Sequence, residues 1–277
     1  MTLTRFEKIC GSLNLQGQGV EIGPAYNPVL PKNQGYKVTV VDHLNSEEIR
    51  EKYRNWNVDT SAIEEVDVVW KSGSLAAALK DHGPFDYILA SHVIEHIPDP
   101  IRFLEDCQVI LKPDGKLSLV VPDKRYCFDY YRQLTTTGEW IEAFLEKRII
   151  HPPRKHFDAF AYAVTKGGAI AWGGGSEGIL ALSGHTLTDA YEQAQRSHVT
   201  GLYSDVHAWQ FTPESFYLII KELNHLSLIS LVDVISYPTA GFEFFVTLQV
   251  CPFGVQCSKL SRADRDAMVS ASYSPKL

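Results

Sequence analysis

Two neighbouring segments, Gly19-Val-Glu-Ile-Gly-Pro-Ala-Tyr-Asn-Pro28 and Tyr36-Lys-Val-Thr-Val-Val-Asp42, determine how the chain is expected to fold. The first is a short apolar run that ends in an acidic residue and a glycine turn. The second is a β-branched run that ends in an aspartate. This pattern predicts a strand, a crossover and a second, parallel strand, with Asp42 at its carboxyl end. Ligands of open α/β sheets bind beyond such strand ends, where a carboxylate can accept hydrogen bonds from ribose hydroxyls. A nucleoside-bearing cofactor is therefore expected.

The turn after the first strand favours a cofactor without phosphate. Dinucleotide binding needs three glycines in the pattern G-x-G-x-x-G, but Ala25 and Pro28 occupy the second and third glycine positions. Pro24, Pro28 and Pro31 also remove backbone N–H groups that would bind a pyrophosphate. S-adenosylmethionine carries a ribose and no phosphate, and it is the predicted cofactor. A nicotinamide oxidoreductase and a purely structural glycine turn are the alternatives.

Composition excludes several classes of partner. The chain has 277 residues and a net charge of −7, and no basic run is longer than two residues, so no nucleic-acid partner is expected. No apolar run approaches the roughly 18 residues of a membrane span, and the N-terminus has no apolar segment typical of a signal peptide. The five cysteines are scattered, which predicts buried free thiols and a cytoplasmic protein with no membrane partner.

Strand and helix patterns alternate as far as Val121 and then stop. Strands are expected at 65–70, 85–90 and 116–121, and helices at 4–13, 45–56, 75–80 and 100–111. This alternation predicts a parallel sheet covered on both faces. Helices at 126–134 and 139–150 and a glycine-rich, mobile segment are expected next. The core pattern resumes with a helix that Thr212 caps, and strands follow at 228–235 and 242–250.

The segment Phe85-Asp-Tyr-Ile-Leu-Ala-Ser-His-Val-Ile-Glu-His-Ile-Pro-Asp-Pro100, together with Leu111–Pro122, resembles the class I S-adenosylmethionine-dependent methyltransferases that act on small molecules. Val20–Gly23 and Val40–Asp42 resemble their first motif and their ribose-binding acid. The resemblance covers about residues 17–123 and 207–250. It implies an α/β, doubly wound, mostly parallel seven-stranded Rossmann-like sheet. The last strand would be antiparallel, and a helical and loop insertion would follow the fifth strand.

The resemblance also implies a division of the chain. Residues 1–123 and 207–250 would form the core that binds S-adenosylmethionine, 124–206 the insertion, and 251–277 a polar C-terminal tail. The tail is expected to be loose from about Ser258. The insertion is expected to serve as a lid for the methyl acceptor or as a dimerisation arm, so a homodimer is an expected assembly. Its aromatic and polar residues suit a small-molecule pocket, and they are Tyr126, Tyr130, Tyr131, Arg132, Arg154, His156, Trp172, His185 and His198.

The cofactor site implied by the resemblance follows the strand ends. Glu21 and Gly23 would flank the methionine part, Asp42 would hold the ribose, and Ser91 and His92 would lie near the sulfonium. The full predicted set of cofactor-binding residues is Glu21, Gly23, Pro24, Ala25, Asp42, His43, Ser72, Gly73, Ser74, Leu75, Ser91 and His92.

Three residues are predicted to be catalytic. His92 is the first candidate for a base, since histidine titrates near neutral pH and the strand end lies beside the reactive end of the cofactor. A histidine that only hydrogen-bonds the turn is the alternative. His207 lies where the insertion rejoins the core, and Asp123 follows the fifth strand, where it could equally cap a helix.

The run His92-Val-Ile-Glu95-His96 also fits the H-x-x-E-H pattern of zinc peptidases. That pattern needs a long helix, which Pro98 prevents. A divalent metal held by His92, Glu95 and His96 is a second interpretation of these residues, but few oxygen ligands are offered and no metal is predicted.

The predicted function is methyl transfer from S-adenosylmethionine to an oxygen or nitrogen of a small molecule, such as a sugar or secondary metabolite. The alternative is a non-catalytic module that binds S-adenosylmethionine and acts through its insertion.

Overall fold

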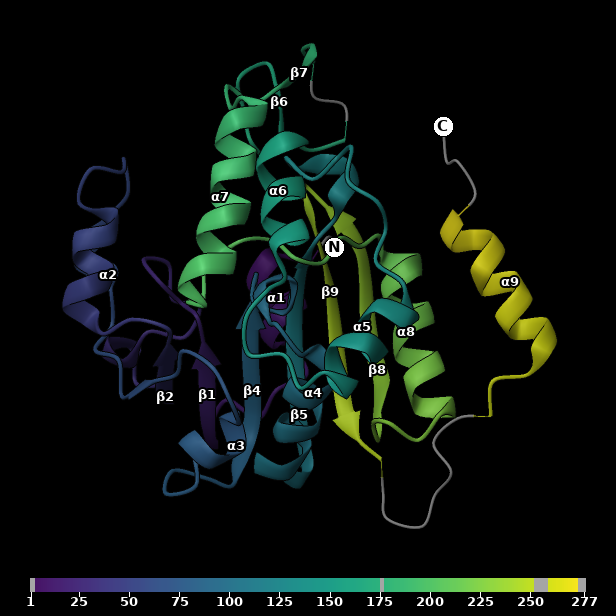
Figure 1. Cartoon of the computed structure of the whole chain (residues 1–277). Coiled ribbons are helices and arrows are strands. Elements are labelled where there is room, and N and C mark those ends of the chain that lie inside the picture. The colour runs from purple at the N-terminus through teal and green to yellow at the C-terminus, as the bar shows by residue number, and fades with distance from the viewer. Residues whose placement is uncertain (1–2, 175–176, 252–258, 274–277) are drawn as a thin grey trace.

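The computed structural model describes residues 3–174, 177–251 and 259–273, and within them one large sheet carries the fold. Its strand order is β3-β2-β1-β4-β5-β9-β8 (Figure 1). The strands are β1 Gln18–Ile22, β2 Lys37–Asp42, β3 Val68–Val69, β4 Phe85–Ser91, β5 Leu111–Pro122, β8 Leu231–Ala240 and β9 Glu243–Val250. Strands β1 to β5 are parallel, and β9 runs antiparallel to both β5 and β8. The predicted seven-stranded sheet with an antiparallel last strand is confirmed.

The predicted helices of the core begin at their capping residues. Asn45 caps α2 in a reciprocal capping box with Glu48, and Thr212 caps α8, whose first residue is Pro213. The helices of the core are α1 Arg5–Cys10, α2 Ser46–Tyr53, α3 Leu75–Ala78, α4 Pro100–Ile110 and α8 Pro213–His225. Short 3₁₀ turns cover Lys32–Gln34, Thr60–Ala62, Ile94–His96 and Lys124–Tyr126.

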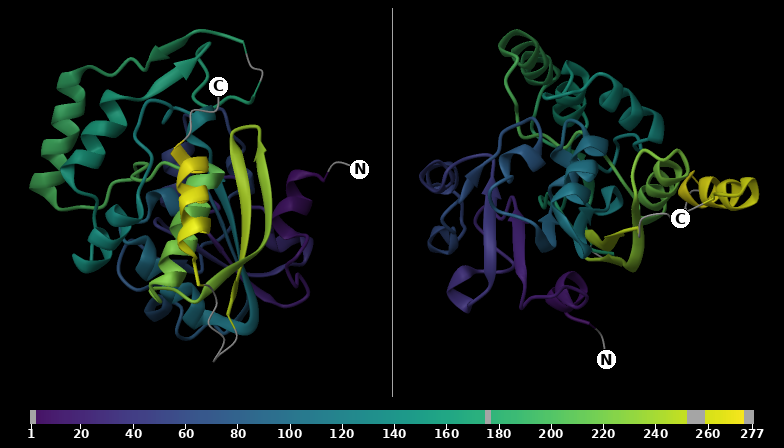
Figure 2. Two further views of the ribbon diagram at one scale, coloured as in Figure 1. Left: turned by 90° about the vertical axis from the view of Figure 1, so that its right-hand side faces the viewer. Right: turned by 90° about the horizontal axis from the view of Figure 1, so that it is seen from below.

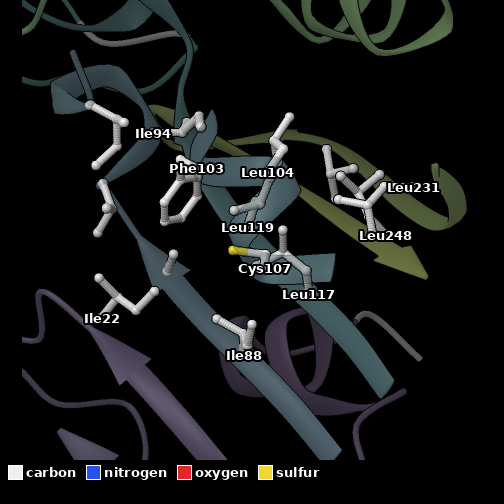
Figure 3. Close-up of a cluster of buried hydrophobic side chains, with 14 of the residues drawn as sticks. Ile22, Ile88, Ile94, Phe103, Leu104, Cys107, Leu117, Leu119, Leu231 and Leu248 are labelled. Atoms are coloured by element: carbon white, nitrogen blue, oxygen red, sulfur yellow. The ribbon is translucent and has the colours of Figure 1, made fainter. Parts of the chain in front are cut away.

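Alternating side chains of the central strands point to opposite faces of the sheet and pack into two separate hydrophobic cores. Ile22, Ile88 and Leu119 lie on one face of the sheet and pack with α4, as Figure 3 shows. On the other face, Leu89 and Val120 pack with Ile9 and Cys10 of α1. Burial on both faces is what a doubly wound sheet requires, and it holds the carboxyl ends of β1, β2 and β4 in fixed positions.

The insertion contains more regular structure than the sequence predicted. It forms α5 Thr137–Leu145, α6 Pro153–Ala161, β6 Val164–Lys166, β7 Leu180–Leu182 and α7 Leu187–Thr200. Helices α6 and α7 pack against each other beyond one end of the sheet (Figures 1 and 2). The ends of the glycine-rich segment pair as the antiparallel strands β6 and β7.

The predicted helix at 126–134 is wrong. After the 3₁₀ turn at Lys124–Tyr126 the backbone is extended at Cys127 and pairs with the glycine-rich segment. The N–H of Phe128 donates to the carbonyl of Ile170, and the N–H of Trp172 donates to the carbonyl of Tyr126. These bonds between distant segments replace the local bonds of a helix.

The tail differs from prediction as well. Residues Arg262–Tyr273 form α9, which packs along α8 (Figures 1 and 2) and joins it through Arg265 Nε and Glu222 Oε1 at 2.6 Å. The prediction of a loose tail is therefore wrong for these residues. Ser272 is the one buried residue of α9, so its sequence carries no apolar pattern that could have revealed it.

Cys10, Cys107 and Cys127 are buried free thiols, as predicted. Cys251 is disulfide-bonded, so the prediction of a free thiol is wrong there, and Cys257 lies outside the described residues. Among the described helices, none is long and apolar enough to cross a membrane.

Candidate active site

A cavity of about 1050 Å³ opens at the carboxyl ends of β1, β2 and β4. Most of the predicted cofactor-binding residues line it. They are Glu21, Gly23, Pro24, Ala25, Asp42, His43, Ser72, Gly73, Ser74, Ser91 and His92. Leu75 is fully buried in the core and does not line the cavity. The topology thus brings together residues from four separate segments of the sequence.

Asp42 and the turn after β1 form one wall of this cavity. The carboxylate of Asp42 is buried and accepts hydrogen bonds from the N–H of Ala25 at 3.2 Å and the N–H of His43 at 2.7 Å. Gly23 has φ +64°, and Ala25 has φ +48°. Ala25 therefore adopts the left-handed conformation that a glycine would favour, and the turn keeps its shape without the second glycine.

Glu21 lines the cavity and also has a structural role. Its carboxylate is buried and accepts hydrogen bonds from the N–H groups of Val29 and Leu30, at 2.7 and 3.0 Å. It therefore holds the proline-containing loop against the sheet. Burial raises the pKa of Glu21 to about 7, even though these two hydrogen bonds act in the opposite direction.

The opposite end of the cavity is built around the start of α3. Asp106 of α4 accepts hydrogen bonds from the N–H of Leu75 at 2.7 Å and from Ser74 Oγ at 3.1 Å. Trp70 stacks on Phe103, with ring centroids 6.1 Å apart. These contacts fix the serine- and glycine-containing turn at 72–74 as a rigid border of polar backbone and hydroxyl groups.

His92 lies at the end of β4 with φ +56° and faces carboxylates on both sides. Its Nε2 lies 2.8 Å from Glu243 Oε2, and its Nδ1 lies 3.4 Å from Glu95 Oε1. Arg5 of α1 donates from Nε to Glu243 at 2.7 Å and from Nη2 to Ser91 Oγ at 3.1 Å. The end of β4, the start of β9 and the N-terminal helix therefore meet at one charged cluster.

The protonation state of His92 follows from these contacts. Burial would lower the pKa of His92, but hydrogen bonds to Glu243 and Glu95 outweigh it and raise the pKa to about 9. His92 is thus protonated at neutral pH in this arrangement. A protonated imidazole cannot take a proton from an acceptor, so a role as base requires that the pair with Glu243 first opens.

The other two predicted catalytic residues do not line the cavity. Asp123 is fully buried, caps the 3₁₀ turn that follows β5 and accepts from Arg125 Nε at 2.9 Å and from Thr239 Oγ1 at 2.6 Å. This is the capping role that the sequence left open. His207 lies behind the cavity wall, where its Nδ1 is 2.6 Å from Asp129 Oδ2 and its ring packs edge-on to that of His96.

The insertion reaches the cavity through other residues than those predicted. None of its nine predicted pocket residues lines the cavity. Its contribution comes from the end of α5 and the segment after α7, namely Phe144, Leu145, Lys147, Arg148, Ile149, Tyr203 and Asp205. Asp205 joins Lys52 of α2 at 2.9 Å, so this segment bridges to the β2 side of the cavity.

Several site residues had no sequence pattern to mark them. Arg5 lies on a short helix near the N-terminus, and Glu243 begins the last strand, 151 positions from its partner His92. Only pairing of β9 with β5 brings Glu243 to the end of β4.

Comparison with known families gives a direct result. The family model described as "Methyltransferase domain" matches residues 3–163, more than half of the chain. The chain belongs to this family. The predicted methyltransferase family is therefore confirmed at the level of the domain.

Curated relatives match over short stretches. A ubiquinone biosynthesis O-methyltransferase of Coxiella burnetii is 26% identical over 95 residues, which cover 32% of this chain and 40% of that protein. A protein of the same name from Caulobacter vibrioides is 33% identical over 82 residues, covering 29% of this chain and 30% of that protein. The matches thus span less than half the length of these relatives.

Among solved structures, the 1,6-didemethyltoxoflavin-N1-methyltransferase of Burkholderia thailandensis is similar with a TM-score of 0.38 and 14% identity. The alignment covers 85% of this chain and 71% of that one. That structure holds 1,6-didemethyltoxoflavin and S-adenosylhomocysteine.

Proposed function

We propose that this methyltransferase transfers a methyl group from S-adenosylmethionine to an oxygen or nitrogen atom of a small molecule. The observation that carries the proposal is the position of Asp42, a buried carboxylate at the carboxyl end of β2 on the wall of the cavity. The cavity volume of about 1050 Å³ supports it, because small-molecule pockets usually hold about 300–1,000 Å³. A cavity slightly larger than this range has room for a cofactor and a small acceptor together.

The donor and acceptor groups on the wall fit S-adenosylmethionine. Asp42 Oδ2 has the N–H of Ala25 as its donor among the described residues, which leaves acceptor capacity for a ribose hydroxyl. Ser72 on the same wall offers a hydroxyl group to an adenine. The turn at 23–31 carries three prolines and cannot offer the series of N–H groups that a pyrophosphate needs. This last feature argues against a nicotinamide cofactor.

The acceptor is proposed to bind on the side of the cavity that the insertion reaches. Leu145 and Ile149 supply exposed apolar surface there, and Arg148, which is paired with Glu142 and Glu146, supplies a charged group. A partly apolar, partly charged wall suits a sugar or a secondary metabolite. The curated relatives are O-methyltransferases by name, which favours oxygen over nitrogen as the acceptor atom. A homodimer stays a prediction.

The protein's own groups then have limited tasks. The bound cofactor supplies an electrophilic methyl group, and the cavity aligns the acceptor with it. A hydroxyl acceptor must also lose its proton. His92 is the cavity residue nearest to this task, but its bond to Glu243 must open before it can accept a proton. A nitrogen acceptor that attacks through its lone pair makes no such demand.

The deciding experiment is calorimetric titration of S-adenosylhomocysteine into wild type and Asp42→Ala. We expect the variant to bind about 10- to 100-fold more weakly, since a hydrogen bond to a charged group contributes about 1.5–3 kcal/mol. Asp114→Ala is the matched control, because Asp114 is exposed in the first part of β5 and does not line the cavity. Wild type that does not bind the ligand would refute the proposal.

A second measurement separates an enzyme from a binding module. Wild type is incubated with S-adenosylmethionine that carries a labelled methyl group and with a pool of small metabolites. Transfer of label to an acceptor is expected. Tight binding of S-adenosylhomocysteine with no transfer to any acceptor in the pool would favour the non-catalytic module.

A further inference from the structure

Glu95 stands out among the buried groups behind the cavity wall. Its side chain is fully buried, and the nearest donor to either carboxylate oxygen is His92 Nδ1, 3.4 Å from Oε1, a long contact that leaves both oxygens incompletely satisfied among the described residues. A buried carboxylate is normally closely paired with a cation, hydrogen-bonded through both oxygens, or bound to a metal ion. The contacts around Glu95 therefore need an explanation.

Two histidines face the same oxygen of Glu95. His96 Nε2 lies 4.0 Å and His207 Nε2 lies 3.9 Å from Oε1, which is too far for a hydrogen bond. The two rings are perpendicular, with centroids 4.6 Å apart. One ligand atom from each of these three residues lies within 4.8 Å of the other two. Their arrangement leaves a space between two nitrogens and one oxygen.

The outer nitrogens of both rings are held by carboxylates. His207 Nδ1 lies 2.6 Å from Asp129 Oδ2, and His96 Nδ1 lies 2.9 Å from Asp205 Oδ1. A carboxylate on Nδ1 favours the tautomer with the proton on that atom and leaves the lone pair on Nε2. Histidines that bind metals characteristically have such a carboxylate partner on the outer nitrogen. Here both histidines have one.

The three residues are held in place by the protein itself. The carbonyl of Glu95 accepts the N–H of Ala208 at 2.8 Å, which fixes the segment after the insertion against the turn that follows β4. Arg132 Nη1 donates to the carbonyl of His207 at 2.6 Å and to Asp129 at 2.7 Å. The ligand atoms are thus positioned by backbone bonds and by a buried ion pair, independently of any ion between them.

We propose that Glu95, His96 and His207 form a binding site for a divalent transition-metal ion. Two imidazole nitrogens and one carboxylate oxygen suit Zn²⁺ or a neighbouring first-row metal, whereas Mg²⁺ and Ca²⁺ prefer oxygen ligands. Ligands about 2.1 Å from a tetrahedral ion lie about 3.4 Å apart, so the two N–O separations here would shorten by about half an ångström on binding. The ion would join the cavity wall, which includes His96, to the segment that returns from the insertion.

His92 is not part of the proposed site. Its Nδ1 lies 3.4 Å from Glu95 Oε1, but its ring is not among the groups that converge within 4.8 Å. Its Nε2 is engaged by Glu243. The metal interpretation of the sequence involved His92, Glu95 and His96, whereas the structure replaces His92 by His207, which lies 112 positions from Glu95 in the sequence.

The test is titration of chelator-treated, full-length protein with Co²⁺, followed by visible absorption spectroscopy. We expect one equivalent to bind with d–d bands typical of a nitrogen- and oxygen-ligated ion, and one equivalent of Zn²⁺ to remove them. His207→Ala and Glu95→Gln should weaken binding at least about 100-fold. Asp129→Asn, which leaves the three ligands in place but removes the carboxylate shared by His207 and Arg132, should weaken it about 10- to 100-fold. His198→Ala, which removes an exposed histidine of α7, should have no effect.

Each contrary outcome is specific. Wild type without a stoichiometric Co²⁺ spectrum would overturn the proposal and leave Glu95 as a carboxylate paired with protonated histidines. Binding that survives His207→Ala but is lost in His92→Ala would also overturn it, because the ion would then have other ligands. Circular dichroism shows whether each variant unfolds cooperatively and is therefore folded. If Glu95→Gln does not fold, Asp129→Asn still tests the metal site. No methyl donor is used, so the result is independent of the proposed function.

Discussion

Glu243 Oε2 lies 2.8 Å from Nε2 of His92, so the first residue of β9 and the residue after β4 form one ion pair at the edge of the cavity. The same carboxylate receives Arg5 from α1. The three groups form a row of alternating charge, with a carboxylate between two cations. The N-terminal helix is thereby coupled to the residue that is best placed to meet a methyl acceptor.

Replacing His92 tests its place at the reactive end of the cavity. We expect His92→Ala to bind S-adenosylhomocysteine within about threefold of wild type, because Asp42 and the turn at 72–74 remain unchanged. Methyl transfer should slow at least tenfold, since a positioned acid–base group typically contributes about 10²–10⁴ in rate. Calorimetry and initial rates measure the two effects. Unchanged turnover would remove His92 from the chemistry.

Removing either member of the Arg5–Glu243 pair should have unequal consequences. Glu243→Ala leaves His92 without its nearest carboxylate, and we expect the free energy of unfolding to fall by about 2–3 kcal/mol. Arg5 is 43% exposed, so Arg5→Ala leaves a carboxylate still paired with His92 and should cost less than about 1 kcal/mol. Urea unfolding of both variants provides the comparison, and equal losses would contradict it.

The sheet could be predicted from the sequence because its patterns are local. The run that ends at Asp42, the motif after β4 and the Thr212 cap each depend on residues close together in the chain. The departure of Ala25 from the glycine pattern of the first turn, however, was read from residue type alone. Ala25 takes φ +48° without being glycine, and side-chain identity does not reveal this.

The catalytic side of the site could not be predicted in the same way. His92 was expected to be a base, but its protonation depends on Glu243, which β9 brings to it from 151 positions away. The position of His207 likewise depends on Asp129 and on the bond between Ala208 and Glu95. Contacts between distant segments decide these roles, and no periodic pattern records them.

Gly19 is expected to tolerate no side chain. It pairs with Tyr87 across β1 and β4, and a Cβ at Gly19 would lie 2.0 Å from Cε2 of the fully buried Tyr87 ring. We therefore expect Gly19→Ala to lower the free energy of unfolding by about 3 kcal/mol. The loss should be smaller in a Tyr87→Leu background, which removes the ring. A double-mutant cycle by urea unfolding tests this, and additive losses would show that the ring is not the cause.

Glu21 should make the stability of the protein without cofactor depend on pH. Burial raises its pKa from 4.5 to about 7, so the folded state keeps a proton that the unfolded state loses above about pH 4.5. The stability from this proton is complete below pH 4.5 and is lost as pH rises through about 7. Relative to Glu21→Gln, which does not titrate, wild type should lose about 3 kcal/mol between pH 4.5 and 8. Urea unfolding of wild type and Glu21→Gln at several pH values measures this difference in stability. Other buried titrating groups, such as His151, are present in both proteins, so their effects cancel. A difference that stays constant with pH would show that Glu21 ionises normally.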